Sequence, residues 1–318
     1  MKNKILFLID PLEKLNIKKD SSIFWAISLK KLGHEVFLIF VKDFYVQNTT
    51  TNLSFKVYDF EGRITSDLYI DHLTVVETKR VDVGPGDTIL MRLDPPFNEA
   101  YLHALWLLEF CAGKGITISN SAKGILQHQE KLAAYKLPLQ ETIPSFVGLL
   151  GDDSLNYLNK LMEEGYKEFI IKPLNSFSGI GVFKFSSSEN FTEYLHSKRA
   201  IIKDYFVLQP FMEKIYEGEI RSIYWRGQEI GSILKKPKEG TFLANIAQGG
   251  KFSKIHLPIA TDIACTKIAK ELLKDGIDLI AYDILDGKIS EVNVTCPGLV
   301  VETSHAYGEN IASKHMLF

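Results

Sequence analysis

The sequence has little of several features that define common classes of protein. Its three cysteines form no CxxC pair and no metal-ligand spacing, which excludes a disulfide scaffold and indicates a reducing compartment. The N-terminal apolar run covers only residues 5–9, too short for a signal peptide, and no other segment approaches the length of a membrane span. The formal net charge of −2 gives no general attraction to nucleic acid or anionic membranes. We therefore expect a cytoplasmic protein that binds neither nucleic acid nor membranes.

The glycine motifs of the common nucleotide-binding folds are also missing. The first part of the chain predicts a strand at residues 4–9, a helix from Asp20 to about Leu32 and a strand at residues 35–41. This β-α-β opening favours the α/β fold class. The connection after the first strand has no G-x-G-x-x-G fingerprint, and no G-x-x-x-x-G-K-[ST] loop occurs anywhere in the chain. These absences argue against a Rossmann dinucleotide site and a Walker loop.

The size of the chain indicates more than one domain. Its 318 residues, 46% of them hydrophobic, can form a large core and two or three domains. A short strand at residues 116–118 is expected to close the first domain near Asn120. The division that we expect is 1–120, 121–200 and 201–318.

The stretch from Asp278 to Gly298 predicts two short strands joined at Asp286-Gly287. Glu291 and Asn293 are two residues apart and therefore project from the same face of their strand. A two-residue turn would put Asp283 on the opposite face. A three-residue loop, Leu285 to Gly287 with Gly287 left-handed, would bring all three side chains together.

In that second arrangement the other face of the hairpin is mostly apolar and would face the core, with Ile280, Tyr282, Ile284, Ser290, Val292 and Val294. Two carboxylates and an amide at close range repel one another unless a cation lies between them, and such hard oxygen ligands suit Mg²⁺. The alternative is an ordinary hairpin whose acidic face is solvated.

Lys172 ends an apolar strand directly before a proline, where burying an ammonium group is costly unless it meets an anion. The following small-residue turn, residues 175–182, has backbone N–H groups that could cradle phosphate, although ordinary hairpins also use such turns. Lys131, on a short predicted helix, could by itself be an ordinary solvated lysine.

Two arginines lie on predicted strands at positions that suggest ligand binding. Arg92 ends a strand next to a double proline, at the edge where α/β sheets bind ligands, although a surface pair with Asp94 is the alternative. Glu219 and Arg221 alternate on one strand face. Arg221 could therefore meet a phosphate or a developing oxyanion, or could pair with Glu219 on the surface.

Two further segments suggest a nucleotide site. The strand at residues 206–212 is kinked at Pro210, which frees backbone groups that could hold an adenine ring. The loop at residues 237–251 contains three glycines, and its length predicts a mobile lid.

Five motifs together resemble the bacterial glutathione synthetase family of the ATP-grasp superfamily. They are NIKKDSS (16–22), MRLDPPF (91–97), EKL (130–132), IIKPL (170–174) and EVNVTCP (291–297). The resemblance implies an ATP-grasp fold in which ATP lies between a small subdomain (121–200) and a large subdomain (201–318), after an N-terminal Rossmann-like parallel-sheet domain. It also implies a homo-oligomer.

The resemblance further implies a role for individual residues. Arg221 and Lys172 would be catalytic. ATP would be bound by Lys131, Lys172, Ser178, Gly179, Gly181, Gln209, Pro210, Phe211, Met212, Lys235 and Asn245. Mg²⁺, with Mn²⁺ as the alternative ion, would be held by Asp283, Glu291 and Asn293. The peptide substrate would be bound by Asp20, Ser21, Arg92 and Gly298.

The reaction implied by the resemblance joins γ-glutamylcysteine to glycine through an acyl phosphate, at the expense of ATP. The chain departs from the family pattern at two positions where arginine is usual, because it has Leu243 in the lid and Val301 before Glu302. Nearby lysines cannot reproduce the fork of an arginine. A ligase acting on other amino-acid or peptide substrates, or a non-catalytic ATP-binding homologue, is therefore an alternative.

Overall fold

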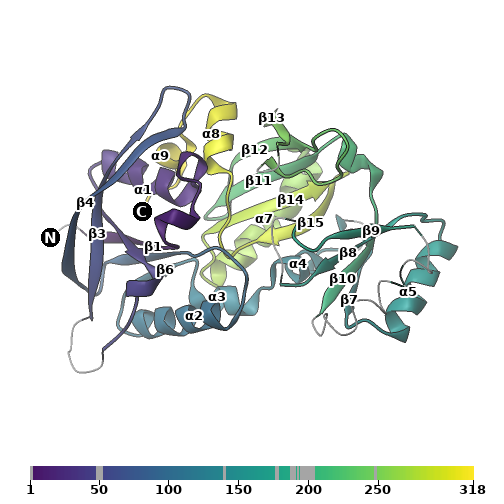
Figure 1. The fold of residues 1–318 in the computed structure, drawn as a ribbon, viewed down its shortest axis with the longest axis horizontal. Coiled ribbons are helices and arrows are strands. Elements are labelled where there is room, and N and C mark those ends of the chain that lie inside the picture. Colours follow the sequence, from purple (N-terminus) through teal and green to yellow (C-terminus); the bar gives the residue numbers. More distant parts are fainter. Residues whose placement is uncertain are drawn as a thin grey trace.

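The computed structural model describes residues 3–47, 53–138, 141–175, 179–186, 191, 193, 205–246 and 249–318. These residues form three β-sheets that follow one another along the long axis of the molecule (Figure 1). A six-stranded sheet lies at one end, a five-stranded sheet in the middle and a four-stranded sheet at the other end.

The six-stranded sheet begins with the predicted β-α-β unit. Its strands are β1 (Lys4–Ile9), β2 (Glu35–Phe40), β3 (Leu53–Ile64), β4 (Ile70–Val83), β5 (Thr88–Arg92) and β6 (Thr117–Ser119), in the order β4-β3-β2-β1-β5-β6. The four strands β2, β1, β5 and β6 are parallel, and the long hairpin of β3 and β4 extends the sheet in antiparallel fashion. β1 and β2 are almost entirely buried because helices cover a parallel sheet on both faces.

Helix α1 (Ser21–Lys31) follows β1 and begins where the sequence predicts. Asp20 is its N-cap residue, and its Oδ1 accepts a 2.7 Å hydrogen bond from the backbone N–H of Ile23. Helix α2 (Glu99–Ala112) connects β5 to β6. The carboxyl ends of β1 and β5 and the start of α1 therefore lie at one edge of this sheet, the edge at which such folds bind ligands.

The central sheet is wholly antiparallel. Its strands are β11 (Glu219–Trp225), β12 (Gln228–Lys236), β13 (Lys251–Ile255), β14 (Leu279–Leu285) and β15 (Lys288–Asn293), in the order β13-β12-β11-β14-β15. Helix α7 (Ile259–Lys274) packs on it, and the hydroxyl of buried Tyr282 donates to the carbonyl of Cys265 in α7 at 2.8 Å. On the opposite face, Ile223, Trp225, Leu279 and Ala281 pack in the core beside the first sheet, and polar side chains occupy the end near the hairpin turn.

The four-stranded sheet consists of β7 (Phe146–Gly148), β8 (Phe169–Pro173), β9 (Phe183–Phe185) and β10 (Phe206–Pro210), in the order β7-β10-β8-β9. Helix α5 (Asp152–Glu163) covers it, with a core that includes Leu158, Phe169 and Phe206. Short helices α3 (Ala122–Gln127) and α4 (Glu130–Ala133) lead from the first sheet toward this one.

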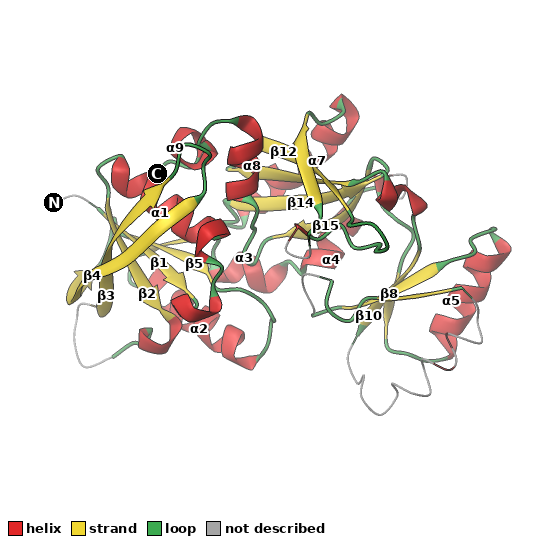
Figure 2. Ribbon diagram, turned by 45° about the horizontal axis from the view of Figure 1, so that its top comes forward, coloured by secondary structure: helices red, strands yellow, loops and turns green. Residues whose placement is uncertain are grey.

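The C-terminal helices α8 (Val300–Tyr307) and α9 (Ile311–His315) return to the first sheet (Figure 2). The indole Nε1 of Trp25 in α1 donates to the carbonyl of Met316 at 2.8 Å, and the Nδ2 of Asn310 donates to the Oγ of Ser28 at 2.9 Å. The start of α8 therefore lies beside the start of α1. No helix among the described residues is both long and apolar enough to cross a membrane.

Candidate active site

The hairpin of β14 and β15 brings Asp283 and Glu291 together in a way that neither sequence alternative describes. The turn has only two residues, Asp286 and Gly287, with φ of +52° and +73°. Beyond it, Ile284 pairs with Ile289 and Asp283 pairs with Glu291, so a β-bulge leaves Ser290 without a partner of its own. With a two-residue turn and no bulge, Asp283 would lie on the opposite face of the hairpin from Glu291. The extra residue shifts the register by one, so Asp283 and Glu291 share a face.

The bulge also corrects the expected orientation of Ser290, which we predicted for the core face. Its Oγ donates to the backbone carbonyl of Asp283 at 3.1 Å and lies 3.5 Å from the Oε1 of Glu219. Ser290 therefore lines the cavity and belongs to the polar face of the hairpin.

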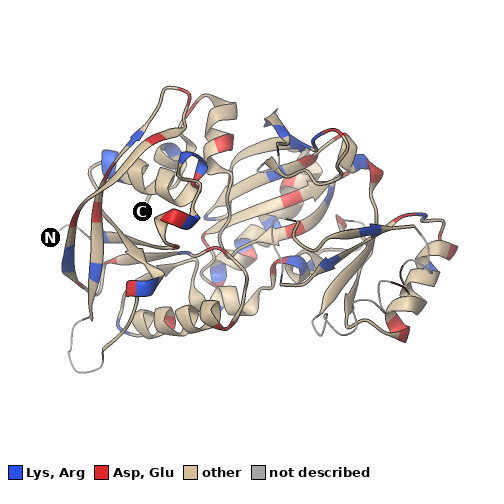
Figure 3. Ribbon diagram, viewed as in Figure 1, with Lys and Arg blue, Asp and Glu red and all other residues tan. Residues whose placement is uncertain are grey.

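A cavity of about 570 Å³ lies where the three sheets meet. The structure brings nearly all of the predicted site residues to its wall: Asp20, Ser21, Arg92, Lys131, Lys172, Gly179, Gln209, Pro210, Phe211, Met212, Arg221, Lys235, Asn245, Asp283, Glu291, Asn293 and Gly298. Gly181 lies in the adjoining turn and does not line the cavity, and Ser178 lies outside the described residues. Figure 3 shows basic and acidic residues interspersed along the ribbon. The charges in the cavity are therefore set by the residues that line it and not by an excess of one sign over the whole molecule.

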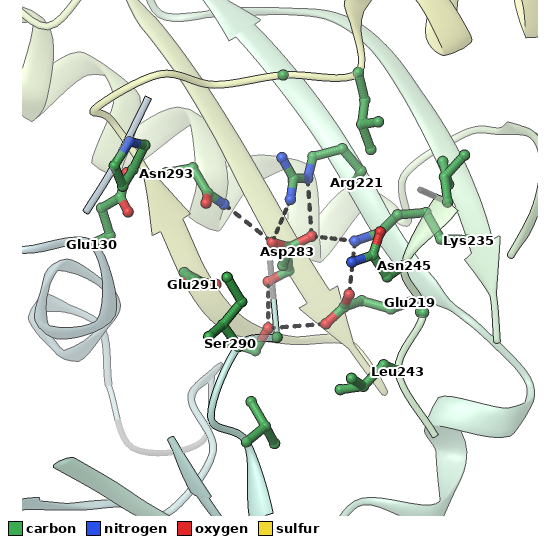
Figure 4. Close-up of a pocket in the computed structure, with 18 of the residues that line it drawn as sticks. Glu130, Glu219, Arg221, Lys235, Leu243, Asn245, Asp283, Ser290, Glu291 and Asn293 are labelled. Atoms are coloured by element: carbon green, nitrogen blue, oxygen red, sulfur yellow. Dashed lines mark hydrogen bonds and ion pairs between the residues drawn. The ribbon is translucent and has the colours of Figure 1, made fainter. Parts of the chain in front are cut away.

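Asp283 is at the centre of a buried charge cluster (Figure 4). Its Oδ1 accepts hydrogen bonds from Arg221 Nε at 2.9 Å and Lys235 Nζ at 2.7 Å, and its Oδ2 accepts from Arg221 Nη2 at 2.8 Å. Burial alone would raise the pKa of Asp283, but the two cations outweigh it and hold this pKa well below its usual range. Asp283 is therefore a permanent anion at neutral pH.

Glu219 completes this cluster from the neighbouring position on β11. Its Oε2 accepts a 2.8 Å hydrogen bond from Lys235 Nζ. Both Glu219 and Arg221 have partners on adjacent strands, and their side chains are mostly buried. The alternative of a surface ion pair between Glu219 and Arg221 is therefore wrong.

Lys131 is a buried member of the site and not a solvated lysine. Its side chain is only 8% exposed, and its Nζ lies 3.1 Å from Glu291 Oε1 and 3.2 Å from the backbone carbonyl of Leu174. Lys131 thus links the hairpin of β14 and β15 to the end of β8, the strand that carries Lys172.

Lys172 faces the same anionic hairpin from β8. Burial lowers the pKa of Lys172, while the charges of Glu291 and Glu219 oppose that effect. The turn that follows contains Gly179 and Gly181, both left-handed with φ of +76° and +75°. A side chain at Gly181 would in addition lie 2.9 Å from the ring of Pro173, so glycine is required there.

An apolar slot lies beside the charge cluster. Ile143, Phe211 and Leu285 pack together there, with Met212 and Phe242 partly buried against them. Gln209 borders the slot with a side chain whose Nε2 donates to Ser145 Oγ at 2.7 Å, whereas its buried Oε1 accepts no hydrogen bond from any described residue. A flat apolar slot with an open hydrogen-bond acceptor suits a base with an exocyclic amine.

The other end of the cavity lies against the first sheet. Arg92 is 6% exposed, and it donates from Nε to Ser22 Oγ at 2.9 Å and from Nη2 to the carbonyl of Pro297 at 2.8 Å. No ion pair joins Arg92 to Asp94 in the described structure, so the alternative of a surface pair is wrong. Burial raises the pKa of Asp20 to about 6, although Arg92 and the N–H of Ile23 oppose the shift.

The residues of the hairpin suit a hard divalent cation. Asp283 lies directly opposite Glu291, and Asn293 Nδ2 donates to Asp283 Oδ2 at 3.1 Å, so the three side chains adjoin. Mg²⁺ usually takes one or two carboxylates from a protein and completes its shell with water and substrate phosphates. Within the described ranges no group of three or more His, Cys, Asp or Glu is arranged to hold a metal. Because two carboxylates and one amide oxygen do not fill the shell of Mg²⁺, this donor set fits a cation that is shared with a phosphate ligand.

Sequence reasoning missed three acidic residues of the site. Glu219 lines the cavity. Its spacing of two residues from Arg221 places both side chains on one strand face, and this could have indicated that Glu219 belongs to the site. The Oε1 of Glu130 accepts from the N–H groups of Val294 and Thr295 at 2.8 and 2.9 Å, which shapes the segment after β15. Glu302 is 3% exposed at the start of α8, and nothing in the local sequence distinguishes it from a residue that favours a helix N-terminus.

Solved structures share this fold over nearly the whole chain. D-cycloserine synthetase DcsG covers 98% of this chain and 100% of its own with a TM-score of 0.63 and 15% identity. The ATP-grasp ligase PsnB, complexed with its minimal precursor, covers 96% of this chain and 94% of its own with a TM-score of 0.61 and 13% identity. The fold is that of the ATP-grasp ligases, and the predicted fold class is confirmed.

Sequence comparison narrows this class to a family. The family model of the prokaryotic glutathione synthetase N-terminal domain matches residues 3–125, and that of its ATP-grasp domain matches residues 130–308. The chain therefore belongs to this family. The glutathione synthetase of Prochlorococcus marinus subsp. pastoris is 27% identical over 317 residues, which cover 98% of this chain and 97% of that protein. The resemblance read from the motifs is confirmed, and the chain is an ATP-dependent ligase.

Proposed function

We propose that this ligase joins the cysteinyl carboxylate of γ-glutamylcysteine to the amine of glycine, with ATP converted to ADP and phosphate. The observation that carries the proposal is the convergence of Lys131, Lys172, Arg221 and the Asp283–Glu291 pair on one cavity that also reaches Arg92. Binding of a nucleotide alone would not need this set of charges. Activation of a carboxylate by phosphoryl transfer needs cations at both the phosphate and the reacting carboxylate.

The first step is attack of the donor carboxylate on the γ-phosphorus of ATP, which forms an acyl phosphate and releases ADP. The glycine amine then attacks the acyl carbon, the C–O bond to phosphate breaks, and the amine loses a proton. Lys131 and Lys172 would neutralise charge on the phosphates, and Arg221 would stabilise the transferring group and the tetrahedral oxyanion. Asp283, Glu291 and Asn293 would hold Mg²⁺, which supplies further neutralisation of the phosphate charge when bound.

The charge cluster must rearrange for this chemistry. Arg221 and Lys235 are now bound to Asp283 at 2.7–2.9 Å, and a polyphosphate carries the competing negative charge that would draw them toward the nucleotide. The loop that carries Leu243 and Asn245 forms one wall of the cavity, so closure over the phosphates would exclude water from the acyl phosphate.

A related ligase with a different amine acceptor is the second candidate. Leu243 is an apolar residue in the cavity wall, and a side chain at Gly179 would meet it at 3.0 Å. Val301 is fully buried in the core and is not part of the cavity wall. These two positions therefore supply no cation to a substrate carboxylate, which favours acceptors other than glycine.

The test is phosphate release by the purified protein with ATP, Mg²⁺ and a panel of donors and acceptors. We expect release only when γ-glutamylcysteine and glycine are both present. Glu291→Ala should lower this rate by about 10²–10³-fold, because it removes one of the carboxylates that would hold Mg²⁺ at the phosphates. The substituted side chain faces the cavity, so the fold should be retained.

The matched control is Glu164→Ala, at an exposed position beyond the end of α5, which should leave the rate unchanged. Turnover with γ-glutamylcysteine and another amine, but none with glycine, would establish the second candidate. No turnover with any pair of substrates would contradict both.

A further inference from the structure

Arg92 is a buried cation without a carboxylate partner. Its two hydrogen bonds within the described structure go to neutral acceptors, Ser22 Oγ and the carbonyl of Pro297, and its Nη1 donates to no described residue. Burying a guanidinium group without an anion costs free energy, and proteins usually pair it. Because Arg92 lines the cavity, an anion bound there can supply the missing partner.

Glu302 is a buried anion on the wall of the same end of the cavity. Its side chain is 3% exposed, and its Oε2 has no hydrogen-bond partner among the described residues. The nearest cation, Lys19 Nζ, lies 3.9 Å from Oε1, beyond hydrogen-bond distance, and its own side chain is 34% exposed. Glu302 therefore has an unfilled acceptor that a bound ammonium group can meet.

Glu302 also has an ordinary structural explanation, but that explanation is incomplete. It is the third residue of α8, where a carboxylate favours the positive end of the helix, and it interacts with its own backbone N–H. A carboxylate that served only the helix could point to solvent and remain hydrated. The burial of Oε2 without a partner is left unexplained by capping.

The two charges are held in one small region by hydrogen bonds between distant segments. Ser22 of α1 accepts from Arg92, and the adjacent Ser21 Oγ accepts from the backbone N–H of Val300 at 3.1 Å. Asp20, next to both serines, lies close enough to Arg92 and to Glu302 to interact with each charge. The arrangement thus places around one end of the cavity a cation that hydrogen-bonds no carboxylate and an anion whose Oε2 has no hydrogen-bond partner among the described residues.

We propose that Arg92 and Glu302 form a subsite for the α-amino-acid head group of the donor, with the α-carboxylate on Arg92 and the α-ammonium on Glu302 and Asp20. A ligand that carries an ammonium and a carboxylate on one carbon can compensate both residues at once. This assignment rests on the proposed function, because a γ-linked glutamyl residue is a donor that keeps its α-ammonium and α-carboxylate free. With its head group held here, the donor's other end extends toward Arg221.

The subsite is tested by donor binding without turnover, measured by isothermal titration calorimetry with no ATP present. The three probes are γ-glutamylcysteine, glutarylcysteine, which lacks the α-ammonium, and 4-aminobutyrylcysteine, which lacks the α-carboxylate. We expect the unmodified protein to bind each truncated probe at least 10-fold more weakly than γ-glutamylcysteine.

Substitutions assign each charge to its residue. Glu302→Gln should weaken γ-glutamylcysteine by 10-fold or more but leave glutarylcysteine within about 2-fold, because that probe has no ammonium to lose. Arg92→Lys should show the reverse pattern, weakening glutarylcysteine and sparing 4-aminobutyrylcysteine. The control is Lys31→Gln, at an exposed position at the end of α1 outside the cavity wall, which should weaken all three probes by less than 2-fold.

The outcomes separate this subsite from the proposed reaction. Equal affinity of the unmodified protein for γ-glutamylcysteine and glutarylcysteine overturns the subsite even if glutathione is formed. Equal weakening of all probes by Glu302→Gln also overturns it, because that pattern indicates a structural role. If γ-glutamylcysteine does not bind but free glutamate or glutamine binds with the same loss in Glu302→Gln, the subsite holds and the proposed reaction fails.

Discussion

The charged side chains at the two ends of the cavity differ in whether they have partners of opposite charge within hydrogen-bond distance. At the end that we propose for the phosphates, Asp283, Arg221, Lys235 and Glu219 are bound to one another at 2.7–2.9 Å. At the end that we propose for the donor, Arg92 and Glu302 are buried to a similar degree but have no partner of opposite charge at hydrogen-bond distance, since Lys19 Nζ lies 3.9 Å from Glu302. The first end is complete without a ligand, and a ligand must compete for its groups. The second end has unfilled hydrogen-bonding groups, and we expect it to gain stability when a ligand binds.

This difference determines how substitutions should act. Removing one member of a paired cluster leaves the other members buried and uncompensated, which is destabilising. Removing an unpaired buried charge relieves a cost that the folded protein otherwise carries, so stability should rise while binding weakens. The following predictions test that contrast.

The largest effect is expected for Asp283→Asn. Arg221 and Lys235 then lose their shared anion, so we expect a loss of about 3–5 kcal/mol in the free energy of unfolding and of about 10³-fold in phosphate release. Chemical denaturation and steady-state kinetics measure the two quantities. The control is Asp286→Asn in the turn of the same hairpin, where φ of +52° suits asparagine and no loss is expected. A Asp283→Asn protein as stable as the unmodified one would contradict the paired description.

A second prediction concerns metal binding. Asp283 is already bound to two cations, so Mn²⁺ should bind the free protein weakly and at least about 10-fold more tightly when a non-hydrolysable ATP analogue draws Arg221 and Lys235 away. Electron paramagnetic resonance of free Mn²⁺ measures this affinity. Glutamate or γ-glutamylcysteine should not change it, because the donor end has no part in the competition. Equal affinity with and without the analogue would show that the cluster is no barrier.

The smallest effect is expected at Asp20 and depends on pH. Its pKa is raised from 3.8 to about 6 in the folded protein, so the folded state takes up a proton more readily than the unfolded chain. Stability should therefore fall as pH rises from about 4 to about 6, and the cost persists above pH 6. Asp20→Asn keeps a helix-capping side chain and should regain about 1 kcal/mol at pH 7, with a flatter profile between these pH values.

Thermal or chemical unfolding across this pH range checks the sign. The contrasting control is Asp71→Asn, because Asp71 pairs with Arg63 on the surface and its pKa is lowered. That variant should show no gain at pH 7. A loss of stability in Asp20→Asn at pH 7 would contradict the cost that we assign to the buried, ionised carboxylate of Asp20.

Much of the fold could be predicted because local patterns and tertiary packing agree. The buried run of β1, the cap at Asp20 and the alternation of β11 each specify an element that the structure confirms. The face shared by Glu291 and Asn293 follows from a period of two. The position of Asp283 could not be decided, since one bulged residue reverses the phase and the sequence has no separate signal for a bulge at Ser290.

Pairing across the site was also beyond sequence reasoning. Spacing places Glu219 and Arg221 on one face, but it does not reveal that Asp283 and Lys235 lie on either side of them, because strand order is set by the whole sheet. Burial likewise depends on the return of α8 to α1, which no local pattern around Glu302 announces. What remained hidden was therefore mainly contact between segments far apart in the chain.

The return of the C-terminal helices to α1 limits how this protein could be recombined. Trp25 and Met316 are joined by a hydrogen bond, and Ser21 and Val300 by another, so the donor end is assembled from both extremities of the described chain. A chimera that exchanges only residues 1–120 with a homologue would separate co-adapted surfaces. Transferring donor preference to a homologue should instead require residues 297–318 to be exchanged together with residues 1–120.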